Sequence, residues 1–211
     1  MKIHYLKLPL TPEQVENLAL GDMVYLTGDL IMTAGIPTHE RIVQYMEEDK
    51  ELPIDMKGQM LLHFGGYNYE CVEEDSKGEM KLRYLNPTTS TRFNAIMPKI
   101  IRGQHLTCVG GKGGLSSESA KAMAETGCVY LSFPGGLATL YTQAIRKLKE
   151  VAWTDFILHY RLVKLEVENL GPGTVGIDAH GNSLYDDIAQ GVEDKMPEIM
   201  AGLTEARNRQ H

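Results

Sequence analysis

Two short polar stretches hold the side chains of this sequence that are best suited to bind an anion. The first is NPTTSTR, residues 86–92, and the second is GGKGG, residues 110–114. Arg92 offers a planar pair of N–H donors that fits a carboxylate, while Lys112 offers a compact positive charge. Glycines around Lys112 allow a ligand to approach the main chain. We therefore predict that the two stretches form one anion-binding site.

Each stretch also has a simpler interpretation. A Thr/Ser cluster after a proline is typical of a helix cap, and a glycine-rich run is typical of a mobile turn. The run around Lys112 lacks the Gly-x-x-x-x-Gly-Lys-Ser/Thr pattern, so it does not predict a nucleotide-binding P-loop. Only the combination of the two stretches favours a ligand site.

The composition is that of an ordinary globular protein. The chain has 211 residues, of which 43% are hydrophobic and 23% charged, with a net charge of −7. A chain of this length can bury a large core, and we expect a single domain over residues 1–211 whose terminal helix, about residues 185–211, frays at its end. The acidic balance argues against nucleic acid and acidic membranes as partners.

The cysteines and the N-terminal sequence indicate the cellular compartment of the protein. The three cysteines are Cys71, Cys108 and Cys128, too few and too scattered for a disulfide framework or a Cys-x-x-Cys metal site. Neither a signal peptide nor a run of 18 apolar residues is present in the sequence. The prediction is a reduced, cytoplasmic protein without a membrane span.

The order of elements predicts an α/β fold. A strand, a glycine loop and a helix follow one another twice between residues 105 and 148, which is typical of parallel strands joined by crossover helices. The strands of this repeat are residues 105–109 and 128–133. Further strands are predicted at residues 3–8, 23–27, 60–64, 162–167 and 174–177, with residues 28–33 as a second strand or a loop and a hairpin at 67–79. Ligands of such sheets collect at the carboxyl ends of the strands.

Three helices bear on the predicted site. Pro37 suits the first turn of a helix that would carry His39. Apolar residues from Phe93 to Ile101 predict a helix that begins near Arg92 and is kinked by Pro98, so the anion site would lie at a positive helix end. Residues 137–148 predict a third helix, with Leu140, Ala144 and Leu148 on one face.

The ordered set of motifs resembles one known family. The motifs are GDMVYLTG (21–28), Thr33-Ala34 with His39 and Arg41, PTTSTR (87–92), GKGG (111–114), EVAWT (150–154) and IDAHGNSL (177–184). Together they resemble the β subunit, or C-terminal half, of the iron–sulfur class I fumarase and L(+)-tartrate dehydratase family, and the resemblance spans most of the chain.

The resemblance implies a swivelling β/β/α domain with a mixed central sheet and flanking helices. It further implies a hydro-lyase that removes water from a 2-hydroxydicarboxylate, L-tartrate to oxaloacetate or malate to fumarate, and that is active only with an α subunit, as a heterodimer or α2β2. A [4Fe–4S] cluster is expected on that α subunit, with none bound by this chain.

The resemblance also implies roles for particular residues. Thr88 would take or return the proton, and Lys112 and Arg92 would stabilise charge on a substrate carboxylate, as the chemistry requires. His39 would act directly or by orienting other groups. The further substrate-binding candidates, which complete the expected site, are Thr33, Thr89, Ser90, Gly111 and Gly113.

One position departs from the family pattern. The family usually has an arginine where this sequence has Gly35, and that arginine grips a substrate carboxylate. Arg41 lies further along the predicted helix and is not expected to replace it. The loss leaves an alternative open, a non-catalytic anion-binding or scaffolding relative.

Overall fold

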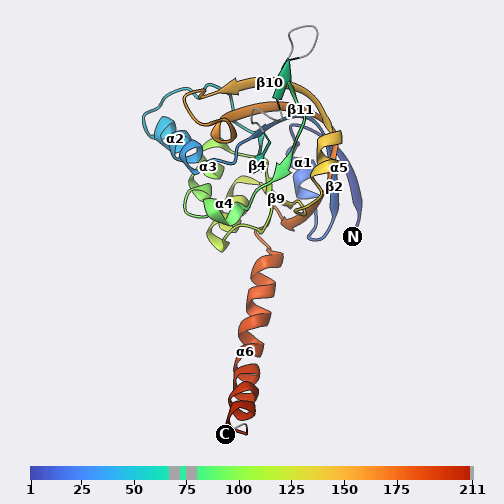
Figure 1. Ribbon diagram of the computed structural model, residues 1–211, viewed down its shortest axis with the longest axis vertical. Coiled ribbons are helices and arrows are strands. Elements are labelled where there is room, and N and C mark those ends of the chain that lie inside the picture. Colours follow the sequence, from blue (N-terminus) through green and yellow to red (C-terminus); the bar gives the residue numbers. More distant parts are fainter. Residues whose placement is uncertain (67–71, 75–79, 210–211) are drawn as a thin grey trace.

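A computed structural model of the chain describes residues 1–66, 72–74 and 80–209. Figure 1 shows a body of strands and helices from which one long C-terminal helix projects. The body has a mixed central sheet flanked by helices, which confirms the predicted α/β class.

The central sheet has seven strands: β1 (Ile3–Lys7), β2 (Met23–Met32), β3 (Met60–Leu62), β8 (Cys108–Gly111), β9 (Val129–Ser132), β10 (Ile145–Ala152) and β11 (Leu162–Ile177). Strands β1, β2, β3, β8 and β9 follow one another in parallel, as the strand and helix alternation predicts. Strand β11 runs antiparallel to β2, β9 and β10. Because β11 pairs with both β2 and β9, the series β2, β3, β8, β9 and β11 closes on itself.

The described helices are α1 (Pro12–Glu16), α2 (Ile36–Glu47), α3 (Met97–Gln104), α4 (Ser117–Thr126), α5 (Ala138–Gln143) and α6 (Leu184–Asn208), with 3-10 turns η1 (Ser90–Phe93) and η2 (Leu158–Tyr160). Local sequence signals explain where several of these helices begin or end. Thr11 and Gln14 form a reciprocal capping box at α1. Gly127 ends α4 in the left-handed conformation, which glycine adopts without a steric cost.

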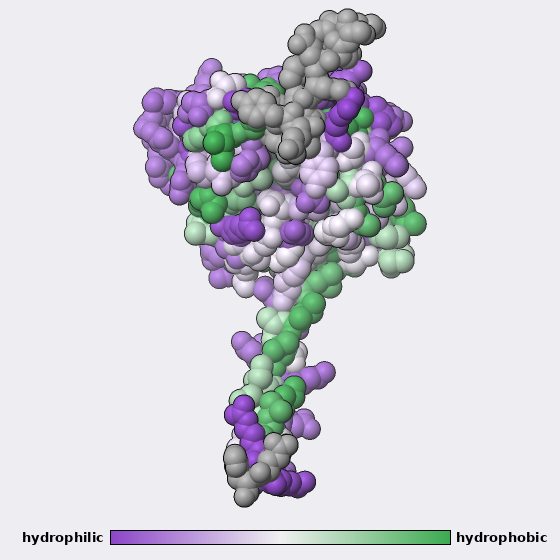
Figure 2. Space-filling model, viewed as in Figure 1, coloured by the Kyte–Doolittle hydropathy of each residue, from purple (hydrophilic) through white to green (hydrophobic). Residues whose placement is uncertain are grey.

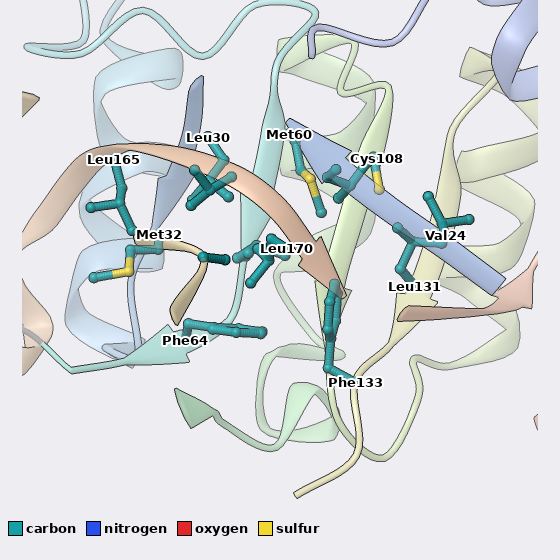
Figure 3. Close-up of a cluster of buried hydrophobic side chains, with 14 of the residues drawn as sticks. Val24, Leu30, Met32, Met60, Phe64, Cys108, Leu131, Phe133, Leu165 and Leu170 are labelled. Atoms are coloured by element: carbon teal, nitrogen blue, oxygen red, sulfur yellow. The ribbon is translucent and has the colours of Figure 1, made fainter. Parts of the chain in front are cut away.

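Side chains alternate between two apolar clusters along each central strand. Met60 and Leu62 of β3 lie inside the closed sheet, whereas Leu61 faces the helices. Val129 and Leu131 of β9 likewise point inward, and Tyr130 points outward. Figure 3 shows the inner cluster, to which β2, β3, β8, β9 and β11 all contribute. The outer cluster packs the sheet against α2, α3 and α4.

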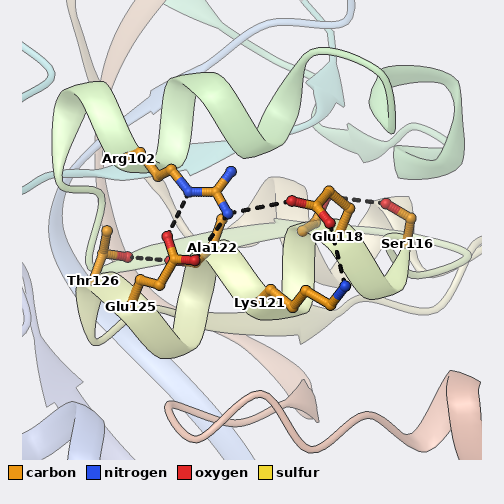
Figure 4. Close-up of polar contacts among 8 residues, drawn as sticks. Arg102, Ser116, Glu118, Lys121, Ala122, Glu125 and Thr126 are labelled. Atoms are coloured by element: carbon orange, nitrogen blue, oxygen red, sulfur yellow. Dashed lines mark hydrogen bonds and ion pairs between the residues drawn. The ribbon is translucent and has the colours of Figure 1, made fainter.

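A surface ion network joins α3 to α4 (Figure 4). Arg102 of α3 bonds Glu125 through Nε at 2.5 Å and Glu118 through a terminal nitrogen at 3.3 Å. Lys121 lies 3.5 Å from the second oxygen of Glu118. The pKa of Arg102 is raised mainly by its hydrogen bond to Glu125. Because these side chains are exposed, the network orients the two helices and adds little stability.

Two strands are longer than the sequence predicts. Residues 23–32 form one strand, so the stretch from Gly28 continues β2 and is not a second strand or a loop. The two strands predicted at 162–167 and 174–177 are one, β11, whose register shifts at Leu170 relative to β2. Bulges let the strand pass through the Gly171-Pro172-Gly173 segment, where the sequence suggests a break.

The predicted helix from Phe93 to Ile101 is two separate elements. The 3-10 turn η1 ends at Phe93, and α3 begins only at Met97. Pro98 therefore starts α3 and does not kink it, because proline at a first helical turn loses no hydrogen bond. Arg92 lies in the last turn of η1, so the expectation that it sits at the positive end of an α-helix is wrong.

The helix predicted over 137–148 is also too long. Helix α5 ends at Gln143, and residues from Ile145 form β10 along the edge of β11. Leu140, Ala144 and Leu148 are spaced by four, which puts them on one face of a helix and equally on one face of a strand. Pairing of Leu148 opposite Leu165 decides in favour of the strand.

The hairpin predicted over residues 67–79 is described only in part. Val72–Glu74 (β5) pairs antiparallel with Met80–Leu82 (β6). Residues 67–71 and 75–79, including Cys71 and the charged tip, lie outside the described residues. None of the helices in the described part of the chain combines the length and hydropathy that a membrane span needs.

The closed sheet predicts a strong dependence of stability on its inner side chains. Leu131 is fully buried there, whereas Leu140 on α5 is 47% exposed. We expect Leu131→Ala to lower the free energy of unfolding by about 2–5 kcal/mol, because the substitution leaves a cavity. Leu140→Ala is the matched control and should change it by less than about 1 kcal/mol. Urea denaturation measures both, and equal effects would contradict this description of the core.

Candidate functional site

Four loops leave the same edge of the parallel sheet. They follow the carboxyl ends of β2, β3, β8 and β9, and begin at Thr33, His63, Lys112 and Phe133. Parallel neighbours present their carboxyl ends together, and the ligands of α/β folds collect at this edge. Both polar stretches singled out from the sequence lie at this edge.

Backbone hydrogen bonds hold the two polar stretches side by side. The Lys112 N–H donates to the Thr88 carbonyl at 3.0 Å, and the Ser90 N–H donates to the Lys112 carbonyl at 2.8 Å. Thr89 and Lys112 form a parallel bridge between them. The Thr88 N–H donates to the His63 carbonyl at 2.7 Å, so the loop after β3 joins the assembly.

The closeness of the two stretches requires a glycine at position 111. A Cβ added to Gly111 would lie 2.2 Å from Ser90 Oγ and 3.2 Å from the Thr88 carbonyl oxygen. Any side chain there would push the two stretches apart. Gly113 is needed for its backbone conformation instead, because its φ is +81°. A Cβ added there would meet only the methyl groups of Thr89 and Thr91, at 3.5 Å and 3.9 Å.

The outer layer of the site carries the charges. Thr88, Thr89 and Lys112 are half-buried and Arg92 is exposed. Among the described residues, no hydrogen bond or ion pair involves the side chain of Lys112, Arg92 or Thr88, so these groups are available to a ligand. The ammonium of Lys112 reaches toward the loop after β9, where a Cβ added to Gly135 would be 3.7 Å from Nζ.

A buried layer beneath these groups fixes Ser90. The Tyr130 hydroxyl donates to Ser90 Oγ at 2.9 Å, and Ser90 Oγ lies 2.8 Å from His63 Nδ1. The other ring nitrogen of His63, Nε2, lies 3.3 Å from the sulfur of Met97. His63 is fully buried, and burial holds its pKa well below the usual value.

His39 belongs to the same buried layer. Its ring stacks on Phe93 with centroids 4.0 Å apart, and Phe93 in turn lies against His63 at 4.4 Å. His39 Nδ1 donates to the Gly35 carbonyl at 2.6 Å, so Nε2 carries the lone pair and has no partner among the described residues. Burial lowers the pKa of His39 to about 4. At neutral pH His39 is therefore an uncharged acceptor inside the protein.

Thr33 and Gly35 form the loop after β2. The Thr33 hydroxyl accepts the Gly35 N–H at 3.2 Å and lies 3.4 Å from the Tyr160 carbonyl, to which it donates. A Cβ at Gly35 would lie 2.6 Å from Thr38 Oγ1 and 2.7 Å from Tyr160 Cβ. The space for a side chain at position 35 is thus filled by neighbours.

Arg41 does not replace a missing cation at position 35. Its guanidinium pairs with Asp155 at 2.8 Å and covers the ring of Phe156 at 3.7 Å. The hydrogen bond to Asp155 raises the pKa of Arg41. Arg41 therefore fastens α2 to the segment that precedes η2.

The structure thus divides the candidate residues into two groups. Thr88, Thr89, Arg92, Lys112 and Gly113 are accessible, whereas the buried group comprises Thr33, His39, Ser90 and Gly111. Sequence reasoning missed His63 and Tyr130, which hold Ser90 from below. A polar residue inside the otherwise apolar run of residues 60–64 is the signal that could have revealed His63.

A large described pocket lies elsewhere. It has a volume of about 770 Å³ and is lined by α3, through residues such as Pro98 and Arg102, and by Met46 of α2. Its lining is mostly apolar and shares no residue with the edge loops. The edge loops, in contrast, bring free cations and backbone donors together.

No metal-ligand cluster of three or more His, Cys, Asp or Glu side chains occurs in residues 1–66, 72–74 and 80–209. Cys108 and Cys128 are buried thiols, and burial raises the pKa of each well above the usual value. Thiols of this kind are poor metal ligands because the thiolate is the ligating form. The described residues therefore do not fit an iron–sulfur cluster.

Comparison with known proteins gives a consistent result. A family model described as "Fumarase C-terminus" matches residues 2–188, so the match ends one turn into α6. A putative L(+)-tartrate dehydratase subunit beta from Methanocaldococcus jannaschii is 31% identical over 90% of this chain and 95% of its own. The L(+)-tartrate dehydratase subunit beta of Escherichia coli is 27% identical over 85% of each chain. A putative class I fumarate hydratase from Geobacillus stearothermophilus is 30% identical over 92% of this chain, but only over 36% of its own length.

The buried histidines predict loss of stability in acid. The pKa of His39 is near 6.5 in the unfolded chain and about 4 in the folded protein. Between these two pH values the unfolded state therefore binds more protons than the folded state. Stability from His39 is complete above pH 6.5 and falls by about 3 kcal/mol as the pH drops to 4. Denaturant titrations at several pH values in this range give the free energy of unfolding. This free energy should depend less on pH for His39→Phe than for the unmodified chain. The exposed control His159→Phe should leave the slope unchanged, and an equal slope in all three proteins would contradict the assignment.

The close packing at Gly111 predicts a sharp effect of one methyl group. We expect Gly111→Ala to lower the free energy of unfolding by about 1–3 kcal/mol, because Ser90 and Thr88 must move. Gly65→Ala is the control, since its added Cβ would make an ordinary 3.7 Å contact with Ala34. Thermal unfolding of both variants measures the difference. Tolerance of alanine at position 111 would mean that the two stretches are not held together as described.

Proposed function

Because the chain belongs to the fumarase C-terminus family, we propose that it is the β subunit of a hydro-lyase that removes water from a 2-hydroxydicarboxylate. The relatives that carry the name tartrate dehydratase or fumarate hydratase catalyse this type of reaction. The observation that carries the proposal is the backbone pairing that sets Lys112 beside Thr88 and Ser90 at the carboxyl edge of the sheet.

Each accessible residue has a role in this proposal. Removal of a proton next to a carboxylate builds negative charge on that carboxylate, which fixed cations must stabilise. Lys112 supplies a point charge and Arg92 a bidentate contact. Thr88 takes or returns the proton. Thr89 and Gly113, together with the buried Gly111, shape the loop against which the carboxylate lies.

The buried residues have supporting roles. His39 is uncharged and fully buried, so we assign it to orienting the loops through Phe93 and Gly35. Ser90 orients the main chain between Thr88 and Arg92. Thr33 holds the loop at Gly35, where no side chain is available to grip a carboxylate. Because Thr38 and Tyr160 fill the space beside Gly35, no cation grips a carboxylate at this position, and we expect this to change which dicarboxylate is accepted.

A second subunit completes the proposed enzyme. Relatives named "subunit beta" imply an α partner, and in the Geobacillus protein the matching region is one part of a longer chain. We assign the [4Fe–4S] cluster to that partner, since the described residues of this chain offer no ligand set. The cluster supplies a Lewis acid for the substrate hydroxyl. Free thiols at Cys108 and Cys128 support assembly in the cytoplasm.

The alternative of a non-catalytic scaffold rests on Gly35 alone. The relatives are named as enzymes, and they do not favour it. Loss of one carboxylate contact changes substrate choice, and the proposed charge-stabilising residues Lys112 and Arg92 are still present.

Removal of the Lys112 charge tests the proposal. Lys112→Met keeps the length of the side chain, and we expect it to lower kcat/KM of the complex with the α subunit by about 100-fold or more. The matched control is Lys121→Met on the outer face of α4. Co-elution with the α subunit shows whether the variant still assembles. Full dehydratase activity of an assembled Lys112→Met enzyme would disprove the role.

A further inference from the structure

Helix α6 extends away from the body of the protein. Its 25 residues span about 37 Å, and Figure 1 shows the C-terminus at the far end of the projection. Ser183 caps the helix by accepting the N–H groups of Tyr185 and Asp186. The Tyr185 ring packs over Gly114, in the loop of Lys112, where an added Cβ would lie 2.6 Å away. After Tyr185 the residues of α6 are exposed, with Gly191 half-buried.

An apolar stripe runs along the exposed part of α6. It consists of five residues spaced by four, four, three and four: Ile188 (65% exposed), Val192 (49%), Met196 (45%), Ile199 (53%) and Leu203 (55%). This spacing puts them on one face of a helix. Figure 2 shows the stripe as a continuous green band. Almost all of it lies beyond residue 188, where the family match ends.

The composition of α6 indicates that the stripe is covered in solution. Gly191, Pro197 and Gly202 lie inside the helix, and each weakens an isolated helix relative to alanine, proline most of all. Helices in proteins gain most of their stability by packing an apolar face. A helix with three weakening residues and no tertiary packing beyond its first turn needs a partner surface to form.

The charges at the two ends of α6 favour a particular arrangement. Asp186 and Asp187 lie in the first turn, while Arg207 and Arg209 lie at the other end. Two parallel copies would put the acidic first turns together. Two antiparallel copies would put the acidic turn of one beside the arginines of the other, and Lys195 beside Glu198 near the centre. Opposite charges at neighbouring helix ends favour this direction of pairing.

We propose that α6 is a dimerisation helix that pairs antiparallel with α6 of a second copy of this chain. Pairing centred near Pro197 brings Leu203 of one copy level with Gly191 of the other, and Val192 level with Gly202. The two glycines flank the stripe and let the helices approach closely. The arrangement puts the two bodies at opposite ends of the pair.

The same charges argue against a membrane as the occupant. Six acidic residues and two basic ones lie within α6: Asp186, Asp187, Glu193, Asp194, Glu198 and Glu205 against Lys195 and Arg207. Helices that lie on anionic lipid surfaces are rich in Lys and Arg on the polar face. The acidic face of α6 would be repelled.

Sedimentation equilibrium of the full chain tests the proposal. The unmodified chain should be a dimer, and the double variant Val192→Asp/Ile199→Asp should dissociate with a Kd raised at least about 100-fold, because two buried apolar side chains are replaced by charges. Gln190→Asp/Ala201→Asp adds the same charge on the opposite face and should remain dimeric. A monomeric unmodified chain at micromolar concentration, or a dimer that survives the stripe variant, would overturn the proposal.

Charge reversal tests the direction of pairing. Arg207→Glu/Arg209→Glu should weaken the dimer, and adding Asp186→Lys/Asp187→Lys should restore it, because the antiparallel contacts are then exchanged. Failure of the combined variant to recover the unmodified Kd would rule out the antiparallel pair. A membrane is the other outcome of the test. If the chain stays monomeric and floats with phosphatidylcholine/phosphatidylserine vesicles, and if the stripe variant no longer floats, the stripe binds a membrane and the proposal is overturned.

Discussion

The site depends on one exchange of backbone hydrogen bonds, in which Lys112 donates to Thr88 and accepts from Ser90. This exchange converts two loops, far apart in the sequence, into a continuation of the parallel sheet beyond its carboxyl edge. It needs a bare backbone at Gly111, since a Cβ there would meet Ser90 Oγ. Because main-chain atoms make the connection, the side chains of Thr88, Arg92 and Lys112 are left to act on a ligand.

The layer beneath explains why this loop geometry is stable. Tyr130, Ser90 and His63 satisfy one another's hydrogen-bonding groups in a fully buried setting, and such networks rigidify a core only when each member has a partner. His39 and Phe93 extend the layer toward Gly35. The polar core thus sits directly under the charged surface. Its uncharged histidines keep positive charge confined to Lys112 and Arg92, where an anionic substrate would bind.

Much of the fold follows from the sequence. The repeated strand, glycine loop and helix predict the parallel strands, and motif order predicts which loops share an edge. The errors have physical causes. Leu140, Ala144 and Leu148 fit both a helix and a strand, and only pairing with Leu165 decides between them. The bulges that carry β11 past Gly171 depend on contacts with β2 that no local pattern encodes. His63 stayed hidden because its partner Ser90 is 27 residues away.

We propose that the loops around Thr88, Arg92 and Lys112 form one anion site on this chain. The most direct test is to titrate the isotopically labelled chain with L-tartrate and to follow backbone amide resonances by NMR. The largest shifts should fall on residues 88–92, 111–114 and 134–136, and they should saturate with a single affinity. Shifts confined to the pocket along α3, or separate affinities for the two polar stretches, would contradict it.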